Sequence, residues 1–221
     1  IERQNRRANT CIGRRARHAP HHAGRFILGN HAAAGGDDVL AAAHAVGASF
    51  EGQPIGSGSN LTAFSFYATK NLTTGEGGMV TTNNAEWATR MRMMSLHGLS
   101  RDAWNRYSAQ GSWYYEILSP GFKYNLTDIA AALGLAQLKK CDRFWKGREH
   151  YAALYHEGFQ DLPEVTCPPV ASHVQHAWHL YVIQLNVDRL RIGRDEFIRQ
   201  LQQAGVGCSV HFIPLHLHPY H

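Results

Sequence analysis

The chain has 221 residues, of which 44% are apolar, with 22 lysines and arginines against 17 acidic residues and a formal net charge of +5. This composition indicates a globular, soluble protein with enough residues for one large domain, or one and a half smaller ones. No apolar run approaches the roughly 20 residues that span a bilayer, and the N-terminus lacks a signal-peptide core, so we expect a cytoplasmic protein without membrane association.

The positive charge is concentrated in residues 1–38, where seven arginines precede the acidic pair Asp37 and Asp38. An arginine-rich arm can bind nucleic acid. This arm has no aromatic residue before Phe26 for base stacking, and no helix-turn-helix or zinc pattern follows it. We therefore predict no nucleic-acid partner, and we treat the structure of 1–38 as poorly determined by the sequence.

The next segments predict alternating strands and helices. We expect a buried strand over 39–45 that turns into a small-residue segment, and strands over 62–67 and 79–82 around a glycine-rich turn. A helix over 85–95 follows the N-cap residues Asn83 and Asn84. Its apolar stripe predicts core packing. That stripe consists of Trp87, Met91 and Met94.

A longer helix is expected from the N-cap residue Thr127, with Asp128 in its first turn, continuing toward Tyr155 and linking two domains. Beyond it, the pattern predicts further elements in chain order. These are a strand over 178–185, a helix over 194–204 ended by Gly205, and a returning strand over 206–212.

Neither cysteines nor histidines predict a metal site. The cysteines are widely spaced, which favours reduced thiols without a disulfide framework; they are Cys11, Cys141, Cys167 and Cys208. The C-terminal histidines fit no standard ligand spacing; they are His211, His216, His218 and His221. We predict no bound metal.

The most informative residue is Lys70, in the stretch SFYATKN (65–71), which is followed by TGEGGMV (74–80). An apolar run over 63–68 delivers a single lysine to a strand end, just before a flexible turn. A lysine in a partly desolvated pocket loses its charge easily and can form a Schiff base with an aldehyde. From these residues alone, the alternative is a surface lysine at the end of a hairpin strand.

Four sequence blocks, in order, resemble the DegT/DnrJ/StrS family of nucleotide-sugar aminotransferases, which depend on pyridoxal phosphate (PLP). The blocks are 64–80 around Lys70, SLHGLSRDAW (95–104), GFKYNLTDIAAALGLAQL (121–138) and HAWHLY (176–181). The resemblance runs from about Val39 to the C-terminus. It is closest to enzymes that aminate a 4-keto sugar nucleotide, such as the 4-amino-4-deoxy-arabinose branch.

The resemblance implies an α/β fold of fold-type I, like that of aspartate aminotransferase. We expect residues 1–140 to form part of the large, mixed-sheet PLP-binding domain. Residues 141–221 are expected to form part of a small α+β C-terminal domain. Family members are longer at both ends, so we expect the chain to be incomplete at both ends.

PLP requires an amine to attach to, donors for its phosphate, a group against its ring and an acid facing its pyridine nitrogen. The resemblance implies that Lys70 supplies the amine and then acts as a general base on the substrate carbon. Ser65 matches the family position whose hydroxyl binds the phosphate; the alternative is a strand serine bonded to backbone.

Two further residues are assigned by resemblance. His44 matches the histidine or glutamine that lies against the cofactor ring, although a lone histidine in an apolar segment is more often a core residue. Asn125 matches the residue that reaches the phosphate of the neighbouring subunit's cofactor, which would make a homodimer with shared active sites. The alternative interpretation of Asn125 is an asparagine that stabilises a turn near a helix N-cap.

One position departs from the family. Three residues before His44 the family carries an aspartate that keeps the pyridine nitrogen protonated, and this chain has Ala41. Without an anion the ring accepts electrons less well, and transamination should slow greatly. Asp38 is a poor substitute, because a shift of three residues along a strand points its side chain to the opposite face.

Two function classes follow. The first, which the resemblance implies, is a PLP-dependent aminotransferase that moves an amino group from glutamate to a keto sugar nucleotide in lipopolysaccharide or antibiotic amino-sugar biosynthesis. The second is a catalytically silent homologue or fragment. A sugar dehydratase of the same fold is disfavoured, because that branch replaces the Schiff-base lysine.

Overall fold

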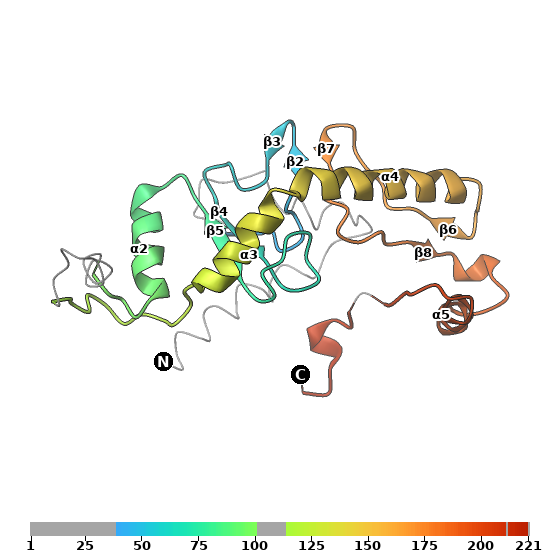
Figure 1. The fold of residues 1–221 in the computed structure, drawn as a ribbon. Coiled ribbons are helices and arrows are strands. Elements are labelled where there is room, and N and C mark those ends of the chain that lie inside the picture. The colour runs from blue at the N-terminus through green and yellow to red at the C-terminus, as the bar shows by residue number, and fades with distance from the viewer. Residues whose placement is uncertain (1–38, 101–113, 211, 221) are drawn as a thin grey trace. The chain divides into compact units, whose positions relative to one another are not determined.

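The computed structural model describes residues 39–100, 114–210 and 212–220 (Figure 1). Their contacts divide into two compact units: the first runs up to Tyr151 and includes Pro169–Leu180, and the second contains Ala152–Pro168 and the chain from Tyr181 onward. Several expectations fall outside the described residues. They concern the arginine-rich arm with Cys11 and Asp38, residues 101–104 of the second sequence block, His211 and His221.

A mixed three-stranded sheet forms the centre of the first unit. Its strands, in the order β1-β4-β5, are β1 (Val39–Ala41), β4 (Leu61–Ser65) and β5 (Gly78–Thr81). β1 and β4 run parallel, whereas β4 and β5 run antiparallel. The prediction of a strand over 39–45 is therefore too long, because β1 ends at Ala41 and the residues that follow form turns.

The two faces of this sheet differ. Leu40 and Phe64 pack on a core of small side chains, formed by Ala42, Ala45, Ala48 and Ala177. Because side chains alternate along a strand, Ala41, Ala63 and Ser65 lie on the opposite face. Alanines let the turn over 42–48 pack closely, and its backbone is closed by bonds from Ala45 N–H to the Ala42 carbonyl and from Ala48 N–H to the Ala45 carbonyl.

A second sheet connects this turn to a segment far along the chain. Its strands are β2 (Ser49–Phe50), β3 (Gln53–Pro54) and β7 (Val174–Gln175), with β2 in the middle and all pairings antiparallel. The amide of Glu51 also donates to the carbonyl of His173 at 2.8 Å. These contacts bring residues 173–179 beside the turn that carries His44.

Helix α2 (Ala85–Ser95) confirms the expected helix and its N-cap. Oδ1 of Asn84 accepts hydrogen bonds from the amides of Glu86 at 2.9 Å and Trp87 at 3.1 Å. The expectation of core packing holds only in part. Trp87, Met91 and the rest of the stripe are half-buried, and no residue of α2, all of which is described, is fully buried.

The chain leaves α2 through Gly98, which has a φ of +71°. The amide of Leu118 donates to the Gly98 carbonyl, and the amide of Phe122 donates to the Met94 carbonyl. The carbonyl of Ser119 lies so close to Gly98 that a β-carbon there would overlap it. Glycine is therefore needed both for its conformation and for the close backbone approach.

The long helix expected from Thr127 is in fact two helices, α3 (Asp128–Leu138) and α4 (Cys141–Phe159). The N-cap is confirmed, since Thr127 Oγ1 accepts from the amide of Ala130 at 3.3 Å. The break between the two helices arises because the amide of Lys140 donates a hydrogen bond to the carbonyl of Gln137, three residues earlier in the chain, at 2.9 Å. A bond of this kind tightens the last turn and ends the α-helical series.

The second unit contains the last part of α4 and two short antiparallel strands, β6 (Val165–Thr166) and β8 (Gln184–Leu185). Helix α5 (Arg194–Gln203) is confirmed and ends before Gly205, whose φ is +81°. The strand expected over 178–185 is wrong except for β8. The returning strand is also wrong, since residues 206–210 and 212 have no paired partner in the described chain; apolar residues form a strand only beside another strand.

Packing in the second unit centres on Tyr181. Its hydroxyl lies 3.1 Å from Nδ1 of His156, whose Nε2 lies 3.1 Å from the carbonyl of Pro168. Burial and the neighbouring Cys167 raise the pKa of Tyr181.

Within the described ranges, no helix has the length and apolar character needed to cross a membrane.

Candidate active site

Lys70 lies in a loop between β4 and β5 that is closed at its neck by Phe66. The amide of Phe66 donates to the Gly77 carbonyl at 2.8 Å, and its carbonyl accepts from the amide of Thr74 at 2.9 Å. The Phe66 side chain is buried, as is that of Leu72 on the far side of Lys70. Lys70 is therefore held on a fixed loop, five residues beyond the end of the strand.

The Lys70 side chain reaches His44. Its Nζ lies 2.7 Å from Nε2 of the imidazole, and the pair is partly buried. A protonated Lys70 can only donate, and Nε2 of His44 then accepts, with the imidazole proton on Nδ1. This geometry contradicts a surface lysine pointing into solvent at a hairpin end. It also shows that His44 contacts the lysine loop rather than apolar side chains alone.

Ser65 is the last residue of β4. Its Oγ accepts a long hydrogen bond, 3.4 Å, from the amide of Tyr67. No hydrogen bond joins Ser65 to Lys70 in the described residues. Ser65 instead shares a sheet face with Ala41, about 8 Å away when the spacings between strands and along a strand are combined. Because Oγ accepts the bond from the Tyr67 amide, its hydroxyl hydrogen can still be donated to another group.

Asn125 lies in the loop before α3. It lines a cavity of about 560 Å³ together with Glu76, Gly77, Gly78 and Leu133, among others. Within the described chain it makes no hydrogen bond to Lys70 or Ser65. The structure thus brings Lys70 and His44 together, and it places Asn125 at a cavity whose lining includes Gly78, the strand partner of Ser65.

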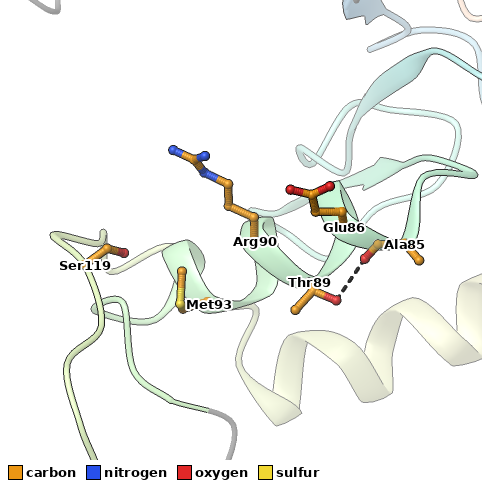
Figure 2. A pocket seen from close by; sticks show the side chains of 6 residues that line it. All are labelled: Ala85, Glu86, Thr89, Arg90, Met93 and Ser119. Atoms are coloured by element: carbon orange, nitrogen blue, oxygen red, sulfur yellow. Dashed lines mark hydrogen bonds between the residues drawn. The ribbon is translucent and has the colours of Figure 1, made fainter.

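Another cavity, also of about 560 Å³, lies along α2 (Figure 2). It is lined by Ala85, Glu86, Thr89, Arg90, Met93 and Ser119. Glu86 and Arg90 extend away from the helix, while Thr89 Oγ1 turns back to the Ala85 carbonyl at 2.8 Å. Its polar groups do not converge, so this cavity lacks the chemistry of a ligand site.

The sequence did not identify two residues that complete the surroundings of Lys70. Asn71, the next residue, is 8% exposed, and its Oδ1 lies 3.0 Å from Nδ1 of His179. The ring of His179 lies 4.2 Å from that of His44, centroid to centroid, at 35°. The only available signal was the position of His179 in the block over 176–181, because spacing gives no hint that residues 71 and 179 meet.

The turn over 176–179 is stabilised by hydrogen bonds between its backbone and two side chains. Nε1 of Trp145 donates to the carbonyl of His176 at 2.9 Å, and the amide of Trp178 donates to Nδ1 of the same histidine, also at 2.9 Å. Burial lowers the pKa of His176. A neutral imidazole is what the geometry requires, since Nδ1 must carry a lone pair to accept the Trp178 amide.

Comparisons with known proteins agree with this geometry. Residues 39–221 match the model of the DegT/DnrJ/EryC1/StrS aminotransferase family. The chain belongs to that family. The sequence resemblance is thereby confirmed over the same part of the chain, and so is the fold class, fold-type I with a mixed sheet.

Individual relatives support the family. The uncharacterized protein MJ1066 of Methanocaldococcus jannaschii is 56% identical over 180 residues, 81% of this chain and 47% of that protein. The spore coat polysaccharide biosynthesis protein SpsC of Bacillus subtilis is 52% identical over 181 residues, 81% of this chain and 46% of SpsC. The chain therefore spans about half the length of these family members.

A solved structure shows the same fold. A Streptococcus pneumoniae protein, described as a candidate sugar aminotransferase in its PLP-form, superposes with a TM-score of 0.70 at 33% identity. The match covers 82% of this chain and 45% of that one. The family fold is thus present here at the level of both sequence and three-dimensional structure.

Proposed function

We propose that this chain carries the lysine-bearing half of a PLP-dependent sugar aminotransferase. The observation that supports this most directly is the 2.7 Å contact between Lys70 Nζ and His44 Nε2 on a closed loop after a sheet strand. A lysine held by a neutral acceptor, rather than by a carboxylate, is not locked into its charged form by an opposite charge. It is suited to covalent chemistry with an aldehyde.

The donor set fits PLP at three positions. Lys70 offers an amine, His44 an imidazole ring beside that amine, and Ser65 a hydroxyl at the end of β4. Ala41 and Ser65, about 8 Å apart on one sheet face, would lie at opposite ends of a pyridine ring and its phosphate arm. The fit fails at the pyridine nitrogen, because the methyl group of Ala41 supplies no anion.

When bound, PLP supplies an electron-withdrawing ring that weakens the C–H bond of an amino-acid donor. Lys70 Nζ would be the group that accepts a proton from the donor carbon and returns it, as a general base and acid in turn. His44 Nε2 lies 2.7 Å from Nζ and thereby fixes the direction in which the amine points. Ser65 Oγ would hold the phosphate by donating a hydrogen bond.

The finer assignments rest on the family. A sugar acceptor is supported by the sugar aminotransferase among the solved relatives, and a polysaccharide pathway by SpsC. Glutamate as the donor and a nucleotide on the keto sugar belong to the same proposal and are implied by the family resemblance. The family resemblance also implies a homodimer in which Asn125 would reach a neighbouring subunit's cofactor phosphate. A cytoplasmic location is part of the same proposal.

Ala41 favours a second candidate, a family member that binds the cofactor without turning over. The Ala41 side chain is exposed on the sheet face that carries Ser65. Strand β1 consists of Val39, Leu40 and Ala41, so the strand itself supplies no carboxylate in place of the family aspartate. Binding through Lys70 does not need that anion, whereas electron withdrawal by the ring does. Both candidates therefore predict that PLP binds through Lys70. Only the aminotransferase is expected to react with an amino-acid donor.

Visible absorption of the protein with added PLP separates these outcomes. We expect a visible absorption band that is lost in Lys70→Ala and kept in Lys146→Ala, which changes an exposed lysine in α4. If glutamate then bleaches the band, the aminotransferase proposal is supported. A Lys70-dependent band that resists glutamate supports the silent homologue, and absence of any such band overturns both.

A further inference from the structure

The residue after Lys70 connects two parts of the site. Asn71 Nδ2 donates to the carbonyl of Ala177 at 2.8 Å and, more weakly, to that of Val46 at 3.4 Å. These two carbonyls fix the orientation of the amide, because only the NH₂ group can face them. Oδ1 must then accept, so Nδ1 of His179, 3.0 Å away, carries a proton.

His179 in turn packs against His44. The two ring centroids lie 4.2 Å apart with planes at 35°, a tilted stacking geometry. His44 is the residue that faces the Lys70 amine. The contacts form a closed circuit, from Lys70 to His44, to His179, to Asn71, and through the peptide bond back to Lys70.

The backbone that presents His179 is strained. Trp178 has a φ of +47°, which is unusual for a bulky side chain. Such a conformation persists only where its surroundings impose it. Here the bond from Trp145 to the His176 carbonyl, the bond from the Trp178 amide to the His176 ring, and the Asn71 amide on Ala177 impose it together.

We propose that His179, held by Asn71 on this strained turn, is a positioning residue that keeps the imidazole of His44 against the Lys70 amine. This inference rests on the proposed function only in taking Lys70 as the working amine. His179 acts through His44, because removing its ring takes away the packing against the His44 imidazole. The contact between His44 and Lys70 Nζ is then weakened, and the amine becomes more accessible to a reagent in solution.

The test measures Lys70 in the protein without cofactor. Trace labelling with acetic anhydride, followed by mass spectrometry, gives the reactivity of Lys70 relative to the exposed Lys146. We expect His179→Ala to raise this ratio at least threefold. His179→Asn keeps an N–H donor for Asn71 but no ring, and we expect the same rise; it also serves if His179→Ala does not fold. An unchanged ratio in folded His179→Asn overturns the proposal.

A double-mutant cycle separates positioning from general loosening. In a His44→Ala background, His179→Ala should add no further change in Lys70 labelling, because the residue through which it acts is gone. Additive effects would overturn the proposal. The PLP band of the unmutated protein is measured independently, so failure of the proposed function and failure of this inference give different results.

Discussion

Ala41 of β1 lies beside Ala63 of β4 in parallel register, on the sheet face that also carries the side chain of Ser65. In a parallel pair the partner residues point to the same side of the sheet. A carboxylate at position 41 would therefore share this face with the Ser65 hydroxyl. The neighbouring position Leu40 points into the alanine core instead.

Ala41→Asp should accelerate the reaction of bound PLP with an amino acid. The new carboxylate would keep the pyridine nitrogen protonated and strengthen electron withdrawal, an electrostatic effect of about 10-fold or more in rate. Stopped-flow bleaching of the visible band by glutamate measures it. Val39→Asp places a carboxylate two residues away on the same face and is the matched control. Equal rates in both variants would contradict this assignment of position 41.

Ser65→Ala should weaken PLP binding without removing its attachment to Lys70. A hydrogen bond to a charged phosphate contributes about 1.5–3 kcal/mol, which corresponds to roughly 10- to 100-fold in affinity. Titration of the visible band gives the dissociation constant. Ser57→Ala, at an exposed serine bonded to the Pro54 carbonyl, controls for loss of a hydroxyl. If both variants bind PLP equally, Ser65 does not hold the phosphate.

Gly98→Ala should destabilise the first unit by at least about 2 kcal/mol. The left-handed backbone costs about 1–2 kcal/mol for an alanine, and its methyl group would overlap the carbonyl of Ser119. Urea unfolding measures the change. Gly147→Ala, within α4, meets no atom within 4 Å and should stabilise the protein by about 1 kcal/mol. Similar values for the two variants would argue against the close approach at Gly98.

His176 should make stability depend on pH. Burial lowers its pKa in the folded protein below 6.5, so the unfolded chain binds more protons as the pH falls below that value. The free energy of unfolding should therefore keep its highest value with respect to His176 above pH 6.5 and decrease below that pH. Urea unfolding at pH 7.5 and 5.5 tests this. In His176→Asn, whose Oδ1 can accept the Trp178 amide without titrating, the decrease should be smaller; an identical decrease would assign it to other groups.

Local signals in the sequence predicted the elements that local chemistry controls. Asn84 and Thr127 cap their helices as expected, because an N-cap bonds to amides only two or three residues away. Gly205 ends α5 for the same local reason. The division of the long helix at Lys139 and Lys140 was not predicted, since helical periodicity continues through a single tightened turn.

Strands were predicted less well, because a strand depends on a partner. Residues 206–210 have the composition of a strand but no neighbouring strand in the described chain. The expected strand over 178–185 meets the strained turn at Trp178, where the backbone cannot stay extended. Burial of the apolar stripe on α2 was likewise overestimated, because periodicity shows which residues share a face but not what covers it.

By itself, the sequence determined the family, and it carries the proposals that Lys70 is the reactive lysine and that Ala41 replaces an acid, because these depend on residue types in a fixed order. Only the tertiary structure decided which residues surround that lysine. Asn71 and His179 are 108 positions apart and meet because the pairing of β2 with β7 returns the chain to the turn that carries His44. Contacts at that separation arise from sheet pairing and packing, which leave no spacing pattern for the sequence to reveal.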